Sequence, residues 1–418
     1  MSGGGEVARY FVSGSLSKDN GLLKVDQRNN FNNNIDLTSY SLRSNVNINL
    51  TKTTEMVVRL SGNFDEYTGP IDGGAEMYQK VMRSNPVLFP QYYPVDEQHQ
   101  FVKHIMFGNS DVGSGGYTNP YADLVRGYKD SSRSLMLAQL ELKQDLSFLT
   151  QGLNAQVMMN TNRTTFFDVT RAYNPYFYKL IGYDPVDNTY AIDAMNEDTG
   201  TEYLNYAPGN RVLNSVFYGQ SQLNYSRSFA KHGFSALIVA MLQNNLSANG
   251  SDLQQSLPSR NMGVSGRATY NYDSRYYLEY NFGYNGSERF AAKQRYGYFP
   301  SVGVAWTLSN EKFFGKIKPI VNNLRLRATY GLIGNDAIGS PSDRFFYLSN
   351  VDMNASIRGA TFGNGLGAGS YLNGVNISRY ANEDITWEKW TKSNLALEIG
   401  LFEKLKITFI KSTIFRFS

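Results

Sequence analysis

Apolar and polar side chains alternate over three consecutive stretches near the middle of the chain. Nearly every second residue is apolar or aromatic in 262–272, 276–284 and 298–308, and the residues between them are small or polar. Because side chains alternate between the two faces of a strand, each stretch predicts a strand with one apolar face and one polar face. The short break at Asp273-Ser274 suits a tight turn, so the pattern predicts an antiparallel meander.

The same alternation recurs along most of the chain and predicts about 13 strands. Many of them are near ten residues or longer, which exceeds the usual length of strands in soluble proteins and matches a strand that crosses a bilayer at a tilt. The strands are expected near residues 8–17, 41–50, 55–66, 133–147, 151–167, 211–229, 233–246, 260–272, 275–286, 297–308, 323–331, 391–402 and 404–410.

The connections between these strands are alternately short and long. The long connections, near 18–40, 67–132, 168–210, 247–259, 287–296 and 332–390, are separated by turns of a few residues and by one medium connection at 309–322. Alternate connections of an up-and-down barrel lie at opposite ends, and outer-membrane barrels have short turns at one end and long loops at the other. A sandwich usually mixes the two lengths. The chain therefore predicts an all-β fold, an antiparallel transmembrane β-barrel.

Composition and charge narrow the possible functions. Aromatic residues reach 14%, with 30 Tyr and 25 Phe, which suits barrel strands with aromatic girdles. The mean hydropathy is −0.39, and no apolar run reaches the roughly 18–20 residues of a spanning helix. A net charge of +4 is too small for this length to indicate nucleic-acid binding, and the absence of Cys excludes disulfides and a thiol nucleophile.

Candidate catalytic and metal-binding groups are few. His99 and His104 are five residues apart in a predicted loop, which matches no common zinc pattern, and the glycine-rich run 363–369 follows no strand-then-helix unit. Adjacent carboxylates, Asp65-Glu66 and Glu383-Asp384, do not converge on one substrate atom. We therefore expect no enzymatic activity, no cofactor and no bound metal.

Tyrosines in the long loops are the candidate ligand-binding residues. Aromatic rings beside amide side chains can bind sugar rings or peptides through stacking and hydrogen bonds. The alternative is that these rings pack the loops against one another or form the interfacial girdle. The candidates are Tyr92, Tyr93, Tyr173, Tyr176 and Tyr178, with Tyr183 nearby.

Several short motifs occur in a fixed order along the chain. They are Tyr298, Phe299, Pro300, Ser301, Trp306, Glu311-Lys312-Phe313-Phe314, Leu324 to Arg327, Tyr330-Gly331, Gly334, Asn335, Ile385-Thr386, Trp387, Glu388, Lys389, Asn394 and Gly400 to Phe402. Earlier strands add Tyr10-Phe11-Val12-Ser13 and Leu42-Arg43-Ser44-Asn45. In this order the motifs resemble the SusC/RagA family of TonB-linked outer-membrane proteins, and the resemblance covers nearly the whole chain.

The resemblance implies a 22-stranded outer-membrane barrel with an N-terminal plug, in a Gram-negative, Bacteroidetes-like cell. It further implies import of oligosaccharides or peptides under a SusD/RagB-like lipoprotein, driven by TonB–ExbB–ExbD. In such a protein the loops 67–132, 168–210 and 332–390 would shape the substrate chamber and contact the lipoprotein. No nucleic-acid partner is implied.

We expect the chain to depart from this pattern at both ends. The sequence as given predicts no basic and apolar leader segment at the N-terminus and no plug or TonB-contacting segment before the first strand. We expect residues 1–410 to be a partial barrel, a fragment of a larger one, and 411–418 to be an atypical tail such as a frameshift or truncation produces.

Two other functions remain open on the sequence. A TonB-dependent siderophore or cofactor receptor would share the architecture but should lack the Tyr-Phe-Pro-Ser and Thr-Trp-Glu-Lys motifs. A non-transporting β-rich surface binding module would have shorter strands with a core on one face.

Overall fold

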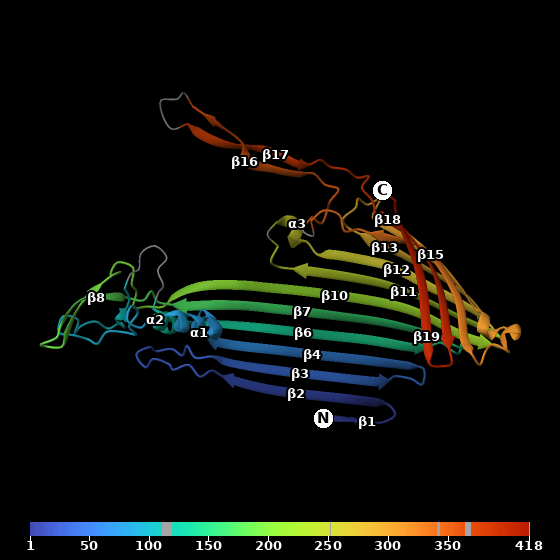
Figure 1. Cartoon of the computed structure of the whole chain (residues 1–418), viewed down its shortest axis with the longest axis horizontal. Helices are drawn as coiled ribbons and strands as arrows, with labels where there is room; N and C mark the ends of the chain where they lie inside the picture. The colour runs from blue at the N-terminus through green and yellow to red at the C-terminus, as the bar shows by residue number, and fades with distance from the viewer. Residues whose placement is uncertain (111–118, 251, 341–342, 364–368, 418) are drawn as a thin grey trace.

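One long antiparallel sheet dominates the molecule (Figure 1). The computed structural model describes residues 1–110, 119–250, 252–340, 343–363 and 369–417. The sheet has 14 strands in the order β1-β2-β3-β4-β6-β7-β10-β11-β12-β13-β14-β15-β18-β19. Their bounds are β1 Ser2–Gly4, β2 Ala8–Asn20, β3 Asp36–Asn49, β4 Thr54–Gly69, β6 Gly127–Asp145, β7 Leu153–Ala172, β10 Asn205–Phe229, β11 His232–Ser247, β12 Ser259–Tyr272, β13 Tyr276–Ser287, β14 Tyr296–Thr307, β15 Val321–Asn335, β18 Glu388–Leu401 and β19 Leu405–Phe417.

The expected strands are confirmed. Apart from the three-residue β1, every strand of the sheet has 12 to 25 residues. Each pairs with its neighbour along the sheet in antiparallel register. The sheet twists strongly, so that β15, β18 and β19 stand steeply against β2 to β7 in Figure 1. An antiparallel barrel wall is therefore the architecture, as the alternation predicted.

Short turns gather at one end of the strands and long connections at the other, as expected. At Asp273 and Ser274 φ is 52° and 54°, and at Phe402 and Glu403 it is 54° and 59°. Two successive positive φ angles are the mark of a type I′ turn, whose twist matches that of a β-hairpin. These tight turns hold neighbouring strands in register at the short-turn end.

The two faces of the sheet differ in crowding as well as in polarity. Apolar side chains on one face stay open to solvent, with Leu278 49%, Tyr298 49% and Val304 51% exposed. On the other face the carboxylates Glu141 and Asp168 are 5% exposed. Side chains splay apart on a convex surface and crowd together on a concave one, so the polar face is the concave face. An apolar outer face around a polar interior is the arrangement of an outer-membrane barrel.

The long connections carry small elements of their own. Between β4 and β6 lie α1 Gly73–Arg83, β5 Phe107–Gly108 and α2 Pro120–Val125, and between β7 and β10 lie β8 Phe177–Asp184 and β9 Thr189–Ala194. The hairpin of β16 Asn350–Phe362 and β17 Ser370–Arg379 projects away from the sheet between β15 and β18 (Figure 1). Smaller elements are α3 Leu253–Ser256 and the turns η1 Leu308–Asn310 and η2 Lys312–Phe314. Among the described residues, no helix is both long and apolar enough to cross a membrane.

The three longest loops are shorter than the sequence indicated, because the strands extend further toward them. The connections are 70–126, 173–204 and 336–387 rather than 67–132, 168–210 and 332–390. The pairing of β6 with β7 continues to Gly127 and Ala172. Main-chain hydrogen bonds continue there although the side chains no longer alternate apolar and polar. Of the glycine-rich run, residues 364–368 lie outside the described residues.

The last strand continues beyond residue 410, where the sequence pattern appeared to end. β19 stays in register with β18 as far as Phe417, with Ile410 opposite Ala396 and Lys411 opposite Leu395. The alternation nevertheless inverts there, because Lys411 shares the apolar face with Leu395 while Ile410 lies on the polar face. The unusual feature of this segment is thus its side-chain pattern, and its origin in a frameshift or truncation remains a prediction.

Lys411 gives a direct test of which face meets lipid. A lysine at the middle of a lipid-facing strand costs about 2–4 kcal/mol, so Lys411→Leu should raise the free energy of unfolding of the full chain in lipid vesicles by roughly that amount. Urea unfolding followed by tryptophan fluorescence measures it. Lys406→Leu, on the polar parity of the same strand, is the control and should give no gain. Equal effects of both substitutions would contradict the assignment of faces.

Candidate functional site: the concave face and the outer loops

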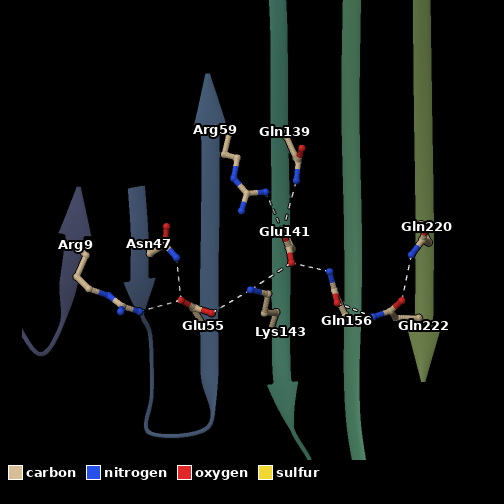
Figure 2. Close-up of polar contacts among 10 residues, drawn as sticks. All are labelled: Arg9, Asn47, Glu55, Arg59, Gln139, Glu141, Lys143, Gln156, Gln220 and Gln222. Atoms are coloured by element: carbon tan, nitrogen blue, oxygen red, sulfur yellow. Dashed lines mark hydrogen bonds and ion pairs between the residues drawn. The ribbon is translucent and has the colours of Figure 1, made fainter. Parts of the chain in front are cut away.

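A network of polar side chains crosses six strands on the concave face near the short turns (Figure 2). Its centre is Glu141 on β6, which accepts hydrogen bonds from Arg59 at 3.3 Å and Gln156 at 2.6 Å and pairs with Lys143 at 3.4 Å. Lys143 also reaches Glu55 at 3.3 Å. The outer members are Arg9, Asn47, Gln139, Gln220 and Gln222.

The charged groups of the network are paired with one another. Within the drawn residues every cation contacts a carboxylate, and Gln156 and Gln222 continue the chain of hydrogen bonds into β7 and β10. A carboxylate that is 5% exposed requires such partners, because an unpaired buried charge is strongly unfavourable. The charges of this network are therefore compensated by one another.

A groove of about 670 Å³ lies on the other half of the concave face, along β14. Ser301, Gly303 and Ala305 on β14 form its floor, and their short side chains leave the space above them open. Side chains of β13 and of β15 with β18 form its two sides, namely Tyr277, Glu279, Asn281, Arg325, Arg327, Thr329, Lys392 and Asn394.

At the long-loop end, three connections pack into one assembly. Ile105, Phe107, Ala122, Val125 and Phe177 form its buried apolar cluster. Asn119, 1% exposed, caps α2 by accepting from the Tyr121 amide at 2.8 Å and donates to the carbonyls of Pro90 and Gly108. The connection from β2 to β3 covers α2, because Asn29 and Asn33 donate to the carbonyls of Val125 and Leu124.

An ion pair in the connection from β2 to β3 links it to this assembly. Arg28 donates to both carboxylate oxygens of Asp26, at 3.0 and 2.6 Å, and the Tyr121 hydroxyl donates to Asp26 at 2.6 Å. The hydrogen bonds from Arg28 hold the pKa of Asp26 far below its usual value, against the opposite effect of burial. The Arg28 guanidinium lies 4.2 Å from the centre of the Tyr92 ring, a cation–π contact.

The predicted ligand-binding tyrosines lie in this assembly, mostly inside it. Tyr178 is 4% exposed, and Tyr93, Tyr173 and Tyr176 pack against the buried clusters. Burial raises the pKa of Tyr93 and of Tyr173. Tyr92 is 42% exposed. Loop packing thus accounts for four of the five rings, and their contact with a ligand remains a prediction.

Two histidines that the sequence left as loop residues meet at Tyr178. His104 contacts the Tyr178 hydroxyl through Nε2 at 2.9 Å and Glu202 through Nδ1 at 3.1 Å, and it stacks on Tyr176 with ring centres 3.8 Å apart. His99 lies edge-on to Tyr178. These contacts join the connection that follows β4 to the one that follows β7.

Motif residues from distant parts of the sequence meet at the long-loop ends of β14, β15 and β18. Phe299 lies 5.1 Å from Trp387, centre to centre, and its ring occupies the space that a side chain at Gly334 would need. Trp387, 9% exposed, donates to the Arg295 carbonyl at 3.2 Å. Asn335 donates to Glu388 at 2.9 Å.

The remaining motif residues occupy other parts of these strands. Tyr298 lies on the outer face with its hydroxyl 2.5 Å from that of Tyr280. Pro300 lies just before Ser301, where the pairing of β14 with β15 begins, so its missing N–H leaves no gap in that ladder. Trp306 donates to Glu311 at 3.0 Å beside the short-turn end.

Sequence reasoning missed the asparagines and the Asp26–Arg28 pair that join the loops, as well as the central role of Glu141. Asparagines recur between 29 and 34, and such clusters favour side-chain bonds to nearby main chain. That signal indicates a structured connection but cannot name the partners, Leu124 and Val125.

The Asp26–Arg28 pair predicts a pH-dependent loop assembly. Because the folded-state pKa of Asp26 is depressed, its stabilising contribution is complete above the unfolded pKa of about 4 and is lost as the pH falls below it. Hydrogen exchange of residues 119–126 should therefore accelerate below about pH 4. Asp26→Asn should accelerate that exchange already at pH 7, whereas Asp36→Asn, which removes an exposed pair with Lys18, should not. Unchanged exchange in Asp26→Asn would contradict this role.

The network predicts unequal effects of its two carboxylates on stability. Glu141→Gln should lower the free energy of unfolding by about 1–2 kcal/mol, a value reduced because its cationic partners are about 40% exposed. Glu55→Gln, at a more exposed carboxylate, should cost under about 1 kcal/mol. Urea unfolding of the full chain in detergent micelles measures both free energies. A larger loss in Glu55→Gln than in Glu141→Gln would contradict the placement of Glu141 at the centre of the network.

Comparison with known proteins identifies the architecture. The chain is 24% identical over 99% of its length to TonB-dependent receptor P3 of Formosa agariphila, covering 39% of that protein. It is 31% identical over 149 residues, 35% of this chain and 14% of the relative, to TonB-dependent receptor SusC of Bacteroides thetaiotaomicron. No family model matches the chain.

Among solved structures, the RagAB peptide importer in its closed-closed state aligns with a TM-score of 0.56 and 16% identity, over 99% of this chain and 43% of that one. This likeness confirms the partial barrel. The chain spans less than half of the length of these relatives. The resemblance to SusC/RagA-type TonB-dependent receptors, expected from the motifs, is confirmed.

Proposed function

We propose that this chain, a relative of the SusC/RagA-type TonB-dependent receptors, forms barrel wall and outer loops of an outer-membrane importer of oligosaccharides or peptides. The observation that carries the proposal is the combination of long two-faced strands with loops that are extended at one end only. Lipid surrounds the apolar face, and cargo passes along the polar face. The location is the outer membrane of a Gram-negative, Bacteroidetes-like cell.

A SusD/RagB-like lipoprotein is the proposed partner at the long-loop end, and TonB–ExbB–ExbD supplies the energy in the intact protein. The β16–β17 hairpin supports a partner there. An isolated two-stranded hairpin is at best marginally stable in water, yet this one exposes Met353, Ile357 and Phe362 at 72%, 79% and 61%. A second protein that covers the hairpin would remove these apolar side chains from water.

The importer is tested in the native host. Deleting the gene should abolish growth on at least one defined oligosaccharide or peptide mixture that is the sole source of carbon or nitrogen. The intact gene should restore this growth. A tonB mutation should reproduce the defect. A defect confined to iron limitation would favour a siderophore receptor instead. Growth equal to the parent strain in all media would contradict an importer.

The barrel itself is tested by electrophoresis of the intact protein from detergent-extracted membranes, because the sheet of this chain ends at two open edges, β1 and β19. The closed barrel of the intact protein should migrate faster before boiling than after it. Recovery in the aqueous fraction with no change on boiling would favour the non-transporting binding module.

The hairpin's role is tested by replacing residues 350–379 with a Gly-Ser turn. The variant should still show heat-modifiable migration but should copurify with less of the lipoprotein. Shortening the connection 248–258, which carries only the four-residue α3, is the control and should leave copurification unchanged.

A further inference from the structure

The outer face of the sheet carries a groove of its own, with a volume of about 710 Å³. It crosses β3, β4, β6, β7 and β10, which are neighbours in the sheet. Each of these strands contributes one small side chain to the groove, and the longer apolar side chains of Leu60, Phe64 and Met136 stand beside them. The small residues are Ser44, Gly62, Ala138, Thr161 and Ser215. The apolar surface is therefore hollowed across five strands.

The register of the strands places this groove on the lipid side. Ala138 lies opposite Leu60 on β4 and opposite Thr161 on β7, and Met136 lies opposite Arg163. Directly opposed residues of an antiparallel pair point to the same face, and Leu60 and Met136 belong to the exposed apolar face. Strands that complete the barrel join at β1 and β19, and a plug would occupy the concave side, so neither covers the groove.

One cation, Arg163, lines the groove. Its guanidinium makes no hydrogen bond or ion pair with any described residue. Other cations of the outer face are paired, since Lys18 contacts Asp36 at 3.1 Å. Arg171 likewise contacts Asp130 at 2.7 Å. Arg163 therefore leaves an uncompensated positive charge beside an apolar groove, and a phosphate is an anion that a guanidinium binds through strong, charge-assisted hydrogen bonds.

Arg163 lies at the level of a membrane interface. A tilted strand crosses the hydrocarbon core in about 9–11 residues, and Arg163 follows ten residues after Leu153, where β7 begins beside a short turn. Tyr40 and Phe64 lie opposite each other on the same face of β3 and β4, and such aromatic residues form the interfacial girdle of a barrel. Short turns are periplasmic and long loops are external in outer-membrane barrels, so the interface at Arg163 belongs to the outer leaflet.

We propose that this groove binds one lipid A molecule of the outer leaflet, with an acyl chain in the groove and a phosphate on Arg163. Lipid A fits both features, because its phosphates stand at the headgroup level directly above its acyl chains. A lipid without an anionic group would fill the groove but leave the guanidinium without a partner. The inference rests on the proposed function, which places the long loops outside an outer membrane, and it adds a lipid site that takes no part in cargo binding.

Lipid retention by the intact protein in mild detergent, measured by native mass spectrometry, is the test. The probes are monophosphoryl lipid A, the same lipid without its phosphate, and phosphatidylglycerol. Monophosphoryl lipid A should bind about tenfold more tightly than the phosphate-free form, the effect of one charge-assisted hydrogen bond, and more tightly than phosphatidylglycerol. Equal binding of the two forms of lipid A, or tighter binding of phosphatidylglycerol, overturns the proposal. A protein dimer that retains no lipid would assign the groove to a second copy and overturns it as well.

Charge variants locate the phosphate. Arg163→Gln should weaken binding of monophosphoryl lipid A about tenfold and should leave binding of the phosphate-free form unchanged, so that the protein no longer distinguishes the two. Arg260→Gln is the matched control and should have no effect, because Arg260 is an exposed cation of the same face on β12, outside the groove. Unchanged affinity in Arg163→Gln, or equal losses in both variants, would overturn the role of Arg163.

A change of shape without a change of charge locates the acyl chain. Ala138→Phe should fill the groove and weaken binding of both forms of lipid A by about tenfold or more. Ala240→Phe is the matched control, because Ala240 is an alanine of the same face on β11, opposite Val264 and outside the groove, and its substitution should leave binding unchanged. Full binding by Ala138→Phe would overturn the assignment of the groove.

Failure of the lipid site and failure of the importer are distinguishable. If the intact gene restores growth on the cargo but the purified protein retains no lipid A, the lipid site is wrong and the importer stands. If the protein retains lipid A with the expected pattern of variants but deletion of the gene changes growth in no medium, the importer is wrong and the lipid site stands. Heat-modifiable migration of every variant shows that it has folded.

Discussion

Main-chain hydrogen bonding in a nonpolar surrounding is the constraint on which this structure depends. In lipid an unpaired N–H or C=O has no water to bind, so a spanning sheet must pair each strand along its length. The strands of 12 to 25 residues and the uninterrupted ladders between β10, β11, β12 and β13 follow from this requirement. The type I′ turn at Asp273-Ser274 maintains it where the chain reverses.

The second consequence is that each strand has two different surfaces. Leu278 and Val304 point outward, and Glu279 and Gly303 beside them point into the concave face. Polar residues are tolerated inward because the concave side holds other polar groups, and there they form either the closed network around Glu141 or the open groove along β14. Lys411 lies on the outer face at the point where the alternation of β19 inverts, and Arg163 of β7 lies on the outer face opposite Met136.

The outer loops are under a different constraint. Water surrounds them, and the buried part of their main chain needs hydrogen-bond partners within the loops. The Asn119 side chain bonds five main-chain groups, the carbonyls of Pro90, Gln91 and Gly108 and the amides of Tyr121 and Ala122. Asn29 and Asn33 bond two more across nearly a hundred residues. Buried aromatic rings, Tyr178 and Phe107 among them, provide the core of this assembly. The β16–β17 hairpin lies apart from this assembly and projects away from the sheet (Figure 1).

The sequence by itself determined the fold class, the strand order and the direction of each apolar face, because alternation and turn chemistry are local properties of the chain. It also determined the family resemblance, through motifs such as Tyr298 to Ser301 and Trp387-Glu388. It could not determine that Phe299, Gly334 and Trp387 meet, that β19 continues past 410, or that most of the loop tyrosines pack against buried apolar clusters. Those facts, and the groove that Arg325 and Lys392 line, arise from strand register and curvature, which place residues far apart in sequence beside one another.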